Sequence, residues 1–146
     1  MVLLVILAHL QMVNKPSRGM ILIVLTGAIG ACWDSVMVTA GWLTYSSGTF
    51  IEGMAPYWIL AMWMLFATTL NMSFRWLRSK LLIASILGAI FGPLSYYAGA
   101  AMGAVVIIDF TATMFGLALA WSILLPGLIV LASRFDGVAL PVEVLR

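Results

Sequence analysis

Long apolar runs separated by short polar connections dominate the pattern of this chain. Residues 20–44 are apolar except for Asp34, and further apolar runs cover residues 56–73, 81–101 and 105–133. These runs are continuous and do not alternate between polar and apolar positions, as the strands of a membrane barrel must. Runs of this length are typical of membrane-spanning helices. The first run ends in Trp42 and Tyr45, an aromatic pair of the kind found at the membrane interface. The pattern therefore predicts an all-α, polytopic transmembrane bundle with four full spans.

The N-terminal apolar segment, residues 1–13, is shorter than these runs. A helix of this length reaches only about 20 Å, whereas the hydrocarbon core of a bilayer is about 30 Å thick. We expect a short helix or partial span there, and no removable signal peptide, because no basic segment precedes it. No linker-like stretch divides the rest, so residues 1–146 are predicted to form a single integral membrane domain. The brief connection at 102–104 predicts that the helices on either side are antiparallel neighbours.

Composition supports a membrane protein and excludes several other classes. Hydrophobic residues make up 64% of the chain, charged residues 8%, and the mean hydropathy is +1.17. The excess of Lys and Arg over Asp and Glu is small and forms no long basic face, which argues against nucleic acid as a partner. Cys32 is the single cysteine, so neither an internal disulfide nor a multi-cysteine metal site is possible. The cofactor, if any, stays unknown from the sequence.

The distribution of charge predicts an orientation. If the segment ending at Val13 exits to the cytoplasm, all Lys and Arg residues fall on the cytoplasmic side and obey the positive-inside rule. These residues are Lys15, Arg18, Arg75, Arg78, Lys80, Arg134 and Arg146. The opposite connections carry Glu52 and Asp109. The C-terminus is therefore expected in the cytoplasm.

Asp34 is the most prominent candidate for chemistry, because a carboxylate near the middle of a span costs about 3 kcal/mol on insertion scales. Helical spacing places it on a face of small residues that includes Gly27 and Gly30, which would permit close helix packing. Two interpretations stay open. Asp34 either fixes helix packing as a neutral or hydrogen-bonded carboxyl group, or it takes part in a proton relay or a substrate site.

A second candidate region lies in the run 81–101. Gly88 and Gly92 form a GxxxG pair that Gly99 continues on the same side, so one helix face carries almost no side chains. Pro93 predicts a kink there. A kinked glycine face can create a small polar pocket near Tyr96, but packing between helices and an aromatic belt are the favoured interpretation.

The remaining candidates lie near the two membrane boundaries. Asn71, Arg75 and Arg78 share one helical stripe and, with His9 on the same side, could contact a lipid headgroup or an acidic partner. A cytoplasmic stop for a span is the simpler interpretation. Asp109 near the opposite boundary either lines a polar path or favours the positive end of a helix dipole.

The stretches "APYWILAMWMLFATTLNMSFRWL" and "GPLSYYAGAAMGAV", after a span with an aspartate, resemble the small bacterial inner-membrane family named domain of unknown function 2878. The matching positions are Asp34, Thr68, Thr69, Asn71, Arg75, Trp76, Gly92, Pro93, Ser95 and Tyr96. The resemblance implies a helical protein of the bacterial inner membrane with a lipid-related accessory role and no established activity. It also implies that this chain is shortened at its N-terminus, with Met1 as an internal start or a truncation.

The leading functional hypothesis is a non-enzymatic accessory or scaffold subunit. Its glycine faces would pack against a larger membrane complex, a lipid-modifying enzyme or a second copy, because each helix offers too few polar groups for catalysis. The alternative is a small transporter or lipid-handling protein in which Asp34, with Tyr96 and Asp109, lines a polar intramembrane path. A weaker alternative is an integral lipid-modifying enzyme that acts at the cytoplasmic interface through Asn71, Arg75 and His9. Membrane lipids are expected partners in every case.

Overall fold

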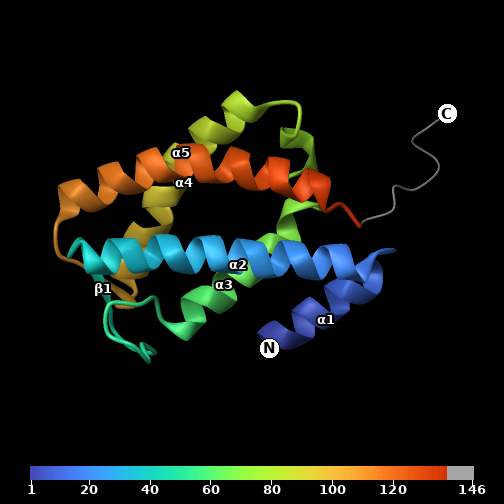
Figure 1. The fold of residues 1–146 in the computed structure, drawn as a ribbon. Coiled ribbons are helices and arrows are strands. Elements are labelled where there is room, and N and C mark those ends of the chain that lie inside the picture. Colours follow the sequence, from blue (N-terminus) through green and yellow to red (C-terminus); the bar gives the residue numbers. More distant parts are fainter. Residues whose placement is uncertain (138–146) are drawn as a thin grey trace.

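The structure, a computed structural model, describes residues 1–137 as five α-helices and one small β-ribbon (Figure 1). The elements are α1 (Val2–Met12), α2 (Pro16–Thr39), β1 (Leu43–Tyr45), α3 (Tyr57–Leu70), the short 3-10 helix η1 (Arg75–Leu77), α4 (Leu81–Ala101), β2 (Val105–Ile107) and α5 (Phe110–Arg134). The mostly helical architecture is confirmed. The strictly all-α expectation needs correction, because two strands pair beside the helix ends.

Three of the described helices, α2, α4 and α5, are long and apolar enough to cross a membrane. Only 17% of the most apolar window of α4 and 22% of that of α5 are buried within the chain. Such extensive apolar surface is not tolerated in water, and lipid is its natural environment. The short N-terminal helix is present as α1.

Four full spans are not confirmed, because α3 has only 14 residues. At 1.5 Å per residue it is about 21 Å long, short of a hydrocarbon core. The helix predicted over 56–73 ends at Leu70, where the carbonyl of Thr69 accepts hydrogen bonds from the amides of Ser73 and Phe74. These bonds turn the chain into the η1 segment.

The β-ribbon occupies positions that the hydrophobic pattern had assigned to the ends of two spans. In the antiparallel pair, Leu43 lies opposite Ile107 and Tyr45 opposite Val105. Gly103, with φ +76°, makes the turn that leads from α4 into β2. Because the predicted spans 20–44 and 105–133 both include ribbon residues, their helices are shorter than expected at this end.

The helices α4 and α5 pack as antiparallel neighbours, as the brief connection between them predicts. Tyr97 near the end of α4 meets Phe110 at the start of α5, with ring centroids 6.4 Å apart. Gly88, earlier in α4, lies against Trp121, farther along α5. The other large contact joins α2 to α3, and α1 packs against both of these helices.

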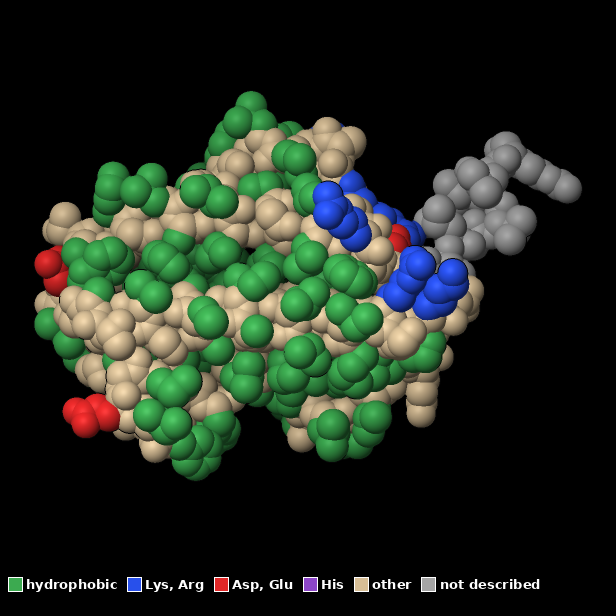
Figure 2. Space-filling view, in the orientation of Figure 1, with side chains coloured by type: hydrophobic (Ala, Val, Ile, Leu, Met, Phe, Trp, Pro, Cys, Tyr) green, Lys and Arg blue, Asp and Glu red, His purple; other side chains and the backbone are tan. Residues whose placement is uncertain are grey.

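Charges gather at the two ends of the molecule. In Figure 2, Lys and Arg side chains cluster where α5 ends, and acidic side chains lie at the opposite end, near the ribbon. We call these the basic end and the ribbon end. Arg146 of the predicted cytoplasmic set lies outside the described residues.

Candidate functional site

Asp34 is the centre of a buried hydrogen-bond cluster that joins four elements. Its side chain is fully buried. The hydroxyls of Tyr45 in β1 and Tyr96 in α4 both donate to Oδ1, and the indole Nε1 of Trp63 in α3 donates to Oδ2 at 2.7 Å. Both carboxyl oxygens therefore accept hydrogen bonds from side chains of this chain, which satisfies a polar group that would otherwise be costly to bury.

The local sequence explains how Trp63 reaches the carboxyl group. Gly30 precedes Asp34 by one helical turn, and a Cβ atom built on it would lie 1.9 Å from the indole ring of Trp63. Only glycine leaves room for this ring. Leu60 and Met64 of α3 also lie close to Gly27, 3.1 and 3.2 Å from the position of a Cβ atom. The small-residue face around Asp34 thus accommodates α3 of the same chain.

The ribbon supplies the second donor. The pairing of Tyr45 with Val105 holds β1 beside the helix ends and buries the Tyr45 side chain. Burial, reinforced by the neighbouring Asp34 carboxyl group, raises the pKa of Tyr45 well above its usual range. The phenol therefore stays protonated and remains a donor.

Sequence reasoning identified Asp34 and Tyr96 but missed two partners. It assigned Tyr45 to an aromatic belt at the membrane boundary, and it gave Trp63 no role. A usable indication for Trp63 was present, since a tryptophan in the middle of an apolar helix needs an acceptor for its N–H group. The identity of that acceptor depends on contacts between distant segments.

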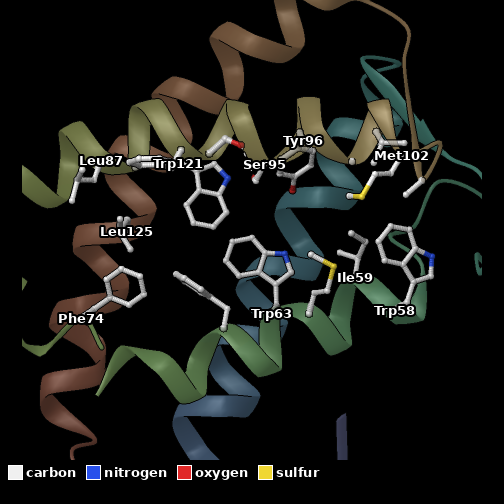
Figure 3. Close-up of a pocket in the computed structure, with 18 residues that line it drawn as sticks. Trp58, Ile59, Trp63, Phe74, Leu87, Ser95, Tyr96, Met102, Trp121 and Leu125 are labelled. Atoms are coloured by element: carbon white, nitrogen blue, oxygen red, sulfur yellow. Dashed lines mark hydrogen bonds between the residues drawn. The ribbon is translucent and has the colours of Figure 1, made fainter. Parts of the chain in front are cut away.

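An apolar groove of about 500 Å³ lies beside this cluster, between α3, α4 and α5 (Figure 3). Trp63 and Tyr96 belong to both features, because each donates to Asp34 and also lines the groove. Trp63 stacks on Trp121 of α5, with ring centroids 5.0 Å apart and an interplanar angle of 13°. The Asp34 cluster therefore holds two residues of the groove wall in place.

The glycines of α4 lie in the groove wall or at the contact between α4 and α5. A Cβ atom on Gly88 would lie 2.1 Å from the carbonyl oxygen of Trp121, and one on Gly92 would lie 2.4 Å from its ring. Gly99 lines the groove and has room for a Cβ atom, whose first neighbour would be Val105 at 3.4 Å. Pro93 lies inside α4, and the helix continues past it to Ala101.

The sequence model of the family described as "Protein of unknown function (DUF2878)" matches residues 1–127. The chain belongs to this family. It matches no curated protein and no solved structure. The range matched by the DUF2878 family contains Asp34, its three donors and every residue that lines the groove.

The predicted stripe of Asn71, Arg75 and Arg78 in this DUF2878 protein forms a cluster with the residues after α5. The stripe is not the face of one helix, because α3 ends before Asn71 and Arg75 lies in η1. Arg75 and Arg78 both form ion pairs with Asp136, the second at 2.8 Å. Arg78 also donates to Asn71 at 2.7 Å. These contacts tie the segment after α3 to the residues after α5. His9 is buried on α1, on a separate element from this cluster.

Asp109 does not join the Asp34 cluster. It is exposed at the N-terminus of α5, where its Oδ1 accepts a hydrogen bond from the amide of Ala112 at 2.9 Å. This contact favours the alternative of a helix-end role over the intramembrane path. Among residues 1–137, no three His, Cys, Asp or Glu side chains come together as a metal site.

Asp109→Ala should reduce the free energy of unfolding by about 1 kcal/mol, because it removes the N-cap of α5. Thermal unfolding in detergent measures this change. Asp109→Asn keeps a capping oxygen and should retain most of the stability. Equal losses in both variants would show that capping is not the main contribution of this side chain.

Proposed function

We propose that this DUF2878 protein is a non-enzymatic membrane protein that binds the apolar chain of a membrane lipid in the groove between α3, α4 and α5. The observation that carries the proposal is the groove of about 500 Å³ itself, which is lined by aromatic, aliphatic and methionine side chains. Ligand sites commonly enclose about 300–1,000 Å³ and are mostly apolar. Two of the lining helices, α4 and α5, are candidate membrane spans.

The polar groups in the groove wall support an apolar ligand. The Ser95 hydroxyl donates to the carbonyl of Gly92 at 2.7 Å, and the Tyr96 hydroxyl donates to Asp34. The indole N–H groups of Trp58 and Trp63 are bonded to Ser47 and Asp34. Because these donors are engaged within the chain, most of the wall suits a hydrocarbon chain better than a polar solute. The exception is the indole N–H of Trp121, which has no acceptor in the described part of the chain.

The proposed function is the lipid-handling alternative, but the lipid lies in the groove and not along a path through Asp34. A polar path through Asp34 is less favoured, because both of its oxygens accept hydrogen bonds from buried side chains. A scaffold that meets its partner through the glycine faces is also less favoured. Gly30, Gly88 and Gly92 contact aromatic residues of the same chain. An accessory-subunit role stays a prediction, which gentle solubilisation and a search for co-purifying subunits can test.

We also propose the bacterial inner membrane as the location, with the basic end in the cytoplasm, on the positive-inside rule. A cysteine placed at Glu52, in a Cys32→Ser background, should react with a membrane-impermeant thiol reagent added outside the inner membrane. A cysteine at Lys80 should react only after the membrane is opened. The reverse pattern would overturn the proposed orientation.

Filling the groove should weaken lipid binding. Ser95→Phe places a large ring among the lining residues, and we expect the affinity for a phospholipid with brominated acyl chains to fall about tenfold, which corresponds to ~1.4 kcal/mol. The measurement is quenching of tryptophan fluorescence in detergent, since Trp58, Trp63 and Trp121 line the groove.

Leu94→Phe is the matched control, because Leu94 is an exposed neighbour in α4 that does not line the groove. Lipid bound at the outer surface quenches both variants equally, so the groove contribution is the part that only Ser95→Phe removes. Gly99→Leu is a second filling variant that keeps the Ser95 hydrogen bond. If both filling variants bind the brominated lipid as well as Leu94→Phe does, the proposed function is wrong.

A further inference from the structure

The groove extends between two regions of opposite charge. In Figure 3, Phe74, Leu87 and Leu125 lie on one side of the groove, and Trp58 and Met102 lie on the other. The first side is connected to the basic end, because Phe74 directly precedes Arg75 of η1. The second side is the ribbon end, because Val105 of β2 also lines the groove there. A long ligand in the groove therefore has one terminus near each end.

The charges at the two ends favour opposite headgroups. Within residues 1–137, the basic end carries Lys15, Arg18, Arg75, Arg78, Lys80 and Arg134, with Asp136 as the acidic residue. The ribbon end carries Glu52 and Asp109. Asp136 already pairs with Arg75 and Arg78. An anionic headgroup is thus attracted to the first end and repelled from the second.

Lys80 is the cation best placed to serve a ligand in the groove. It is exposed at the start of α4, seven residues before the groove residue Leu87, which is about two helical turns. Its amine lies 5.7 Å from the ring centre of Trp76, which is itself exposed. An exposed tryptophan beside a lysine at the end of a membrane helix is typical of the headgroup region.

On the ribbon side of the groove, the wall residue Trp58 makes contacts within the chain. Trp58 donates to the carbonyl of Ser47 at 2.9 Å and packs edge-on against Tyr45, with ring centroids 5.4 Å apart. The amide of Tyr57 is bonded to Gly48. These contacts hold Trp58, a residue of the groove wall, against the connection between β1 and α3. Its N–H group is therefore not free for a headgroup on this side, whereas the basic end supplies cations.

We propose that the groove binds an anionic phospholipid, with its phosphate beside Lys80 at the basic end and an acyl chain directed toward the ribbon. This inference rests on the proposed function and adds the class of lipid and its orientation. Arg75 and Arg78 contribute less than Lys80, because Asp136 offsets their charge. The ligand is recognised by charge at one end and by apolar burial along its length.

The test compares two lipids that differ only in headgroup. Brominated phosphatidylglycerol and brominated phosphatidylcholine with identical chains are titrated into the purified full chain in neutral detergent at low salt. We expect phosphatidylglycerol to bind about fivefold more tightly, and this preference to shrink at high salt because the interaction is electrostatic. Lys80→Gln should remove most of the preference. Phosphatidylcholine binding should fall less than phosphatidylglycerol binding, because the choline group offsets the charge of its phosphate.

Arg18→Gln is the control, since it removes the same charge from α2, which does not line the groove. It should keep the preference for phosphatidylglycerol. Equal affinity for the two lipids in the unmodified protein, with binding still lost in Ser95→Phe, would overturn the anionic headgroup and leave the proposed function standing. An equal loss of preference in Arg18→Gln and Lys80→Gln would overturn the placement beside Lys80. Absence of groove-dependent binding for both lipids would overturn the proposed function as well.

Discussion

Asp34→Ala should destabilise this protein more than any other single replacement of a polar side chain in the described part of the chain. It leaves the hydroxyls of Tyr45 and Tyr96 and the N–H group of Trp63 without their acceptor. Each buried donor that loses its partner costs about 1–3 kcal/mol. The expected loss in unfolding free energy is therefore several kcal/mol, measured as a lowered midpoint of thermal unfolding in detergent.

Asp34→Asn distinguishes hydrogen bonding from packing, because it preserves the shape of the side chain. The amide oxygen can still accept from the two tyrosines, but the NH₂ group then faces the N–H of Trp63, and two donors cannot bond to each other. We expect an intermediate loss of stability. Because Trp63 lines the groove, we also expect weaker binding of the brominated lipid.

Glu52→Gln is the matched control for this prediction, since it exchanges an exposed carboxylate for an amide near the same end of the molecule. Its midpoint should change little. If Asp34→Asn and Asp34→Ala both unfold at the midpoint of the unmodified protein, the three hydrogen bonds do not stabilise the fold.

Gly88→Ala is expected to have the second largest effect, because a single methyl group there conflicts with backbone. The new Cβ atom would lie 2.1 Å from the carbonyl oxygen of Trp121 and 3.2 Å from Cβ of Leu125. Neither atom can rotate away as the end of a flexible side chain could, so α4 and α5 must separate. Overpacking of this kind costs about 1–3 kcal/mol, and the separation should also disturb the stacking of Trp121 on Trp63.

Gly127→Ala in α5 is the control for this clash, because a Cβ atom at this position meets nothing within 4 Å. Alanine favours helix over glycine by about 1 kcal/mol, so this variant should be as stable as the unmodified protein or slightly more stable. Thermal unfolding of the two variants side by side tests the contact. Equal stability of Gly88→Ala and Gly127→Ala would contradict the close approach of α4 to α5.

Two features of the candidate site, Asp34 and the glycine face of α4, could be predicted from the sequence. Asp34 could be singled out because an ionisable group in an apolar run is costly wherever its partners lie. The spacing of Gly88 and Gly92 predicted a bare helix face, and that face lies against Trp121. The partner of a glycine face is not encoded in its spacing, so the sequence left open whether another chain or this one fills it.

Two expectations from the sequence differ from the structure: the position of Tyr45 and the end of the helix in the run 56–73. Tyr45 was expected at the membrane boundary because aromatic residues at the ends of apolar runs often lie there, yet the pairing of β1 with β2 turns it toward Asp34. The helix in the run 56–73 ends early because the carbonyl of Thr69 accepts the amides that turn the chain. Both outcomes depend on backbone hydrogen bonds that hydropathy does not register.

From the sequence alone one can predict a mostly helical protein whose long apolar runs suit lipid. One can also predict that basic and acidic residues lie in connections at opposite ends of the helices. Those properties follow from composition and from the order of residues, because burial of apolar surface and the cost of charge in a bilayer act locally on each segment. The folded arrangement adds two features that the sequence does not show: Asp34 joins four elements, and an apolar groove opens beside it. Those features arise where residues far apart in the chain come within hydrogen-bonding or van der Waals distance.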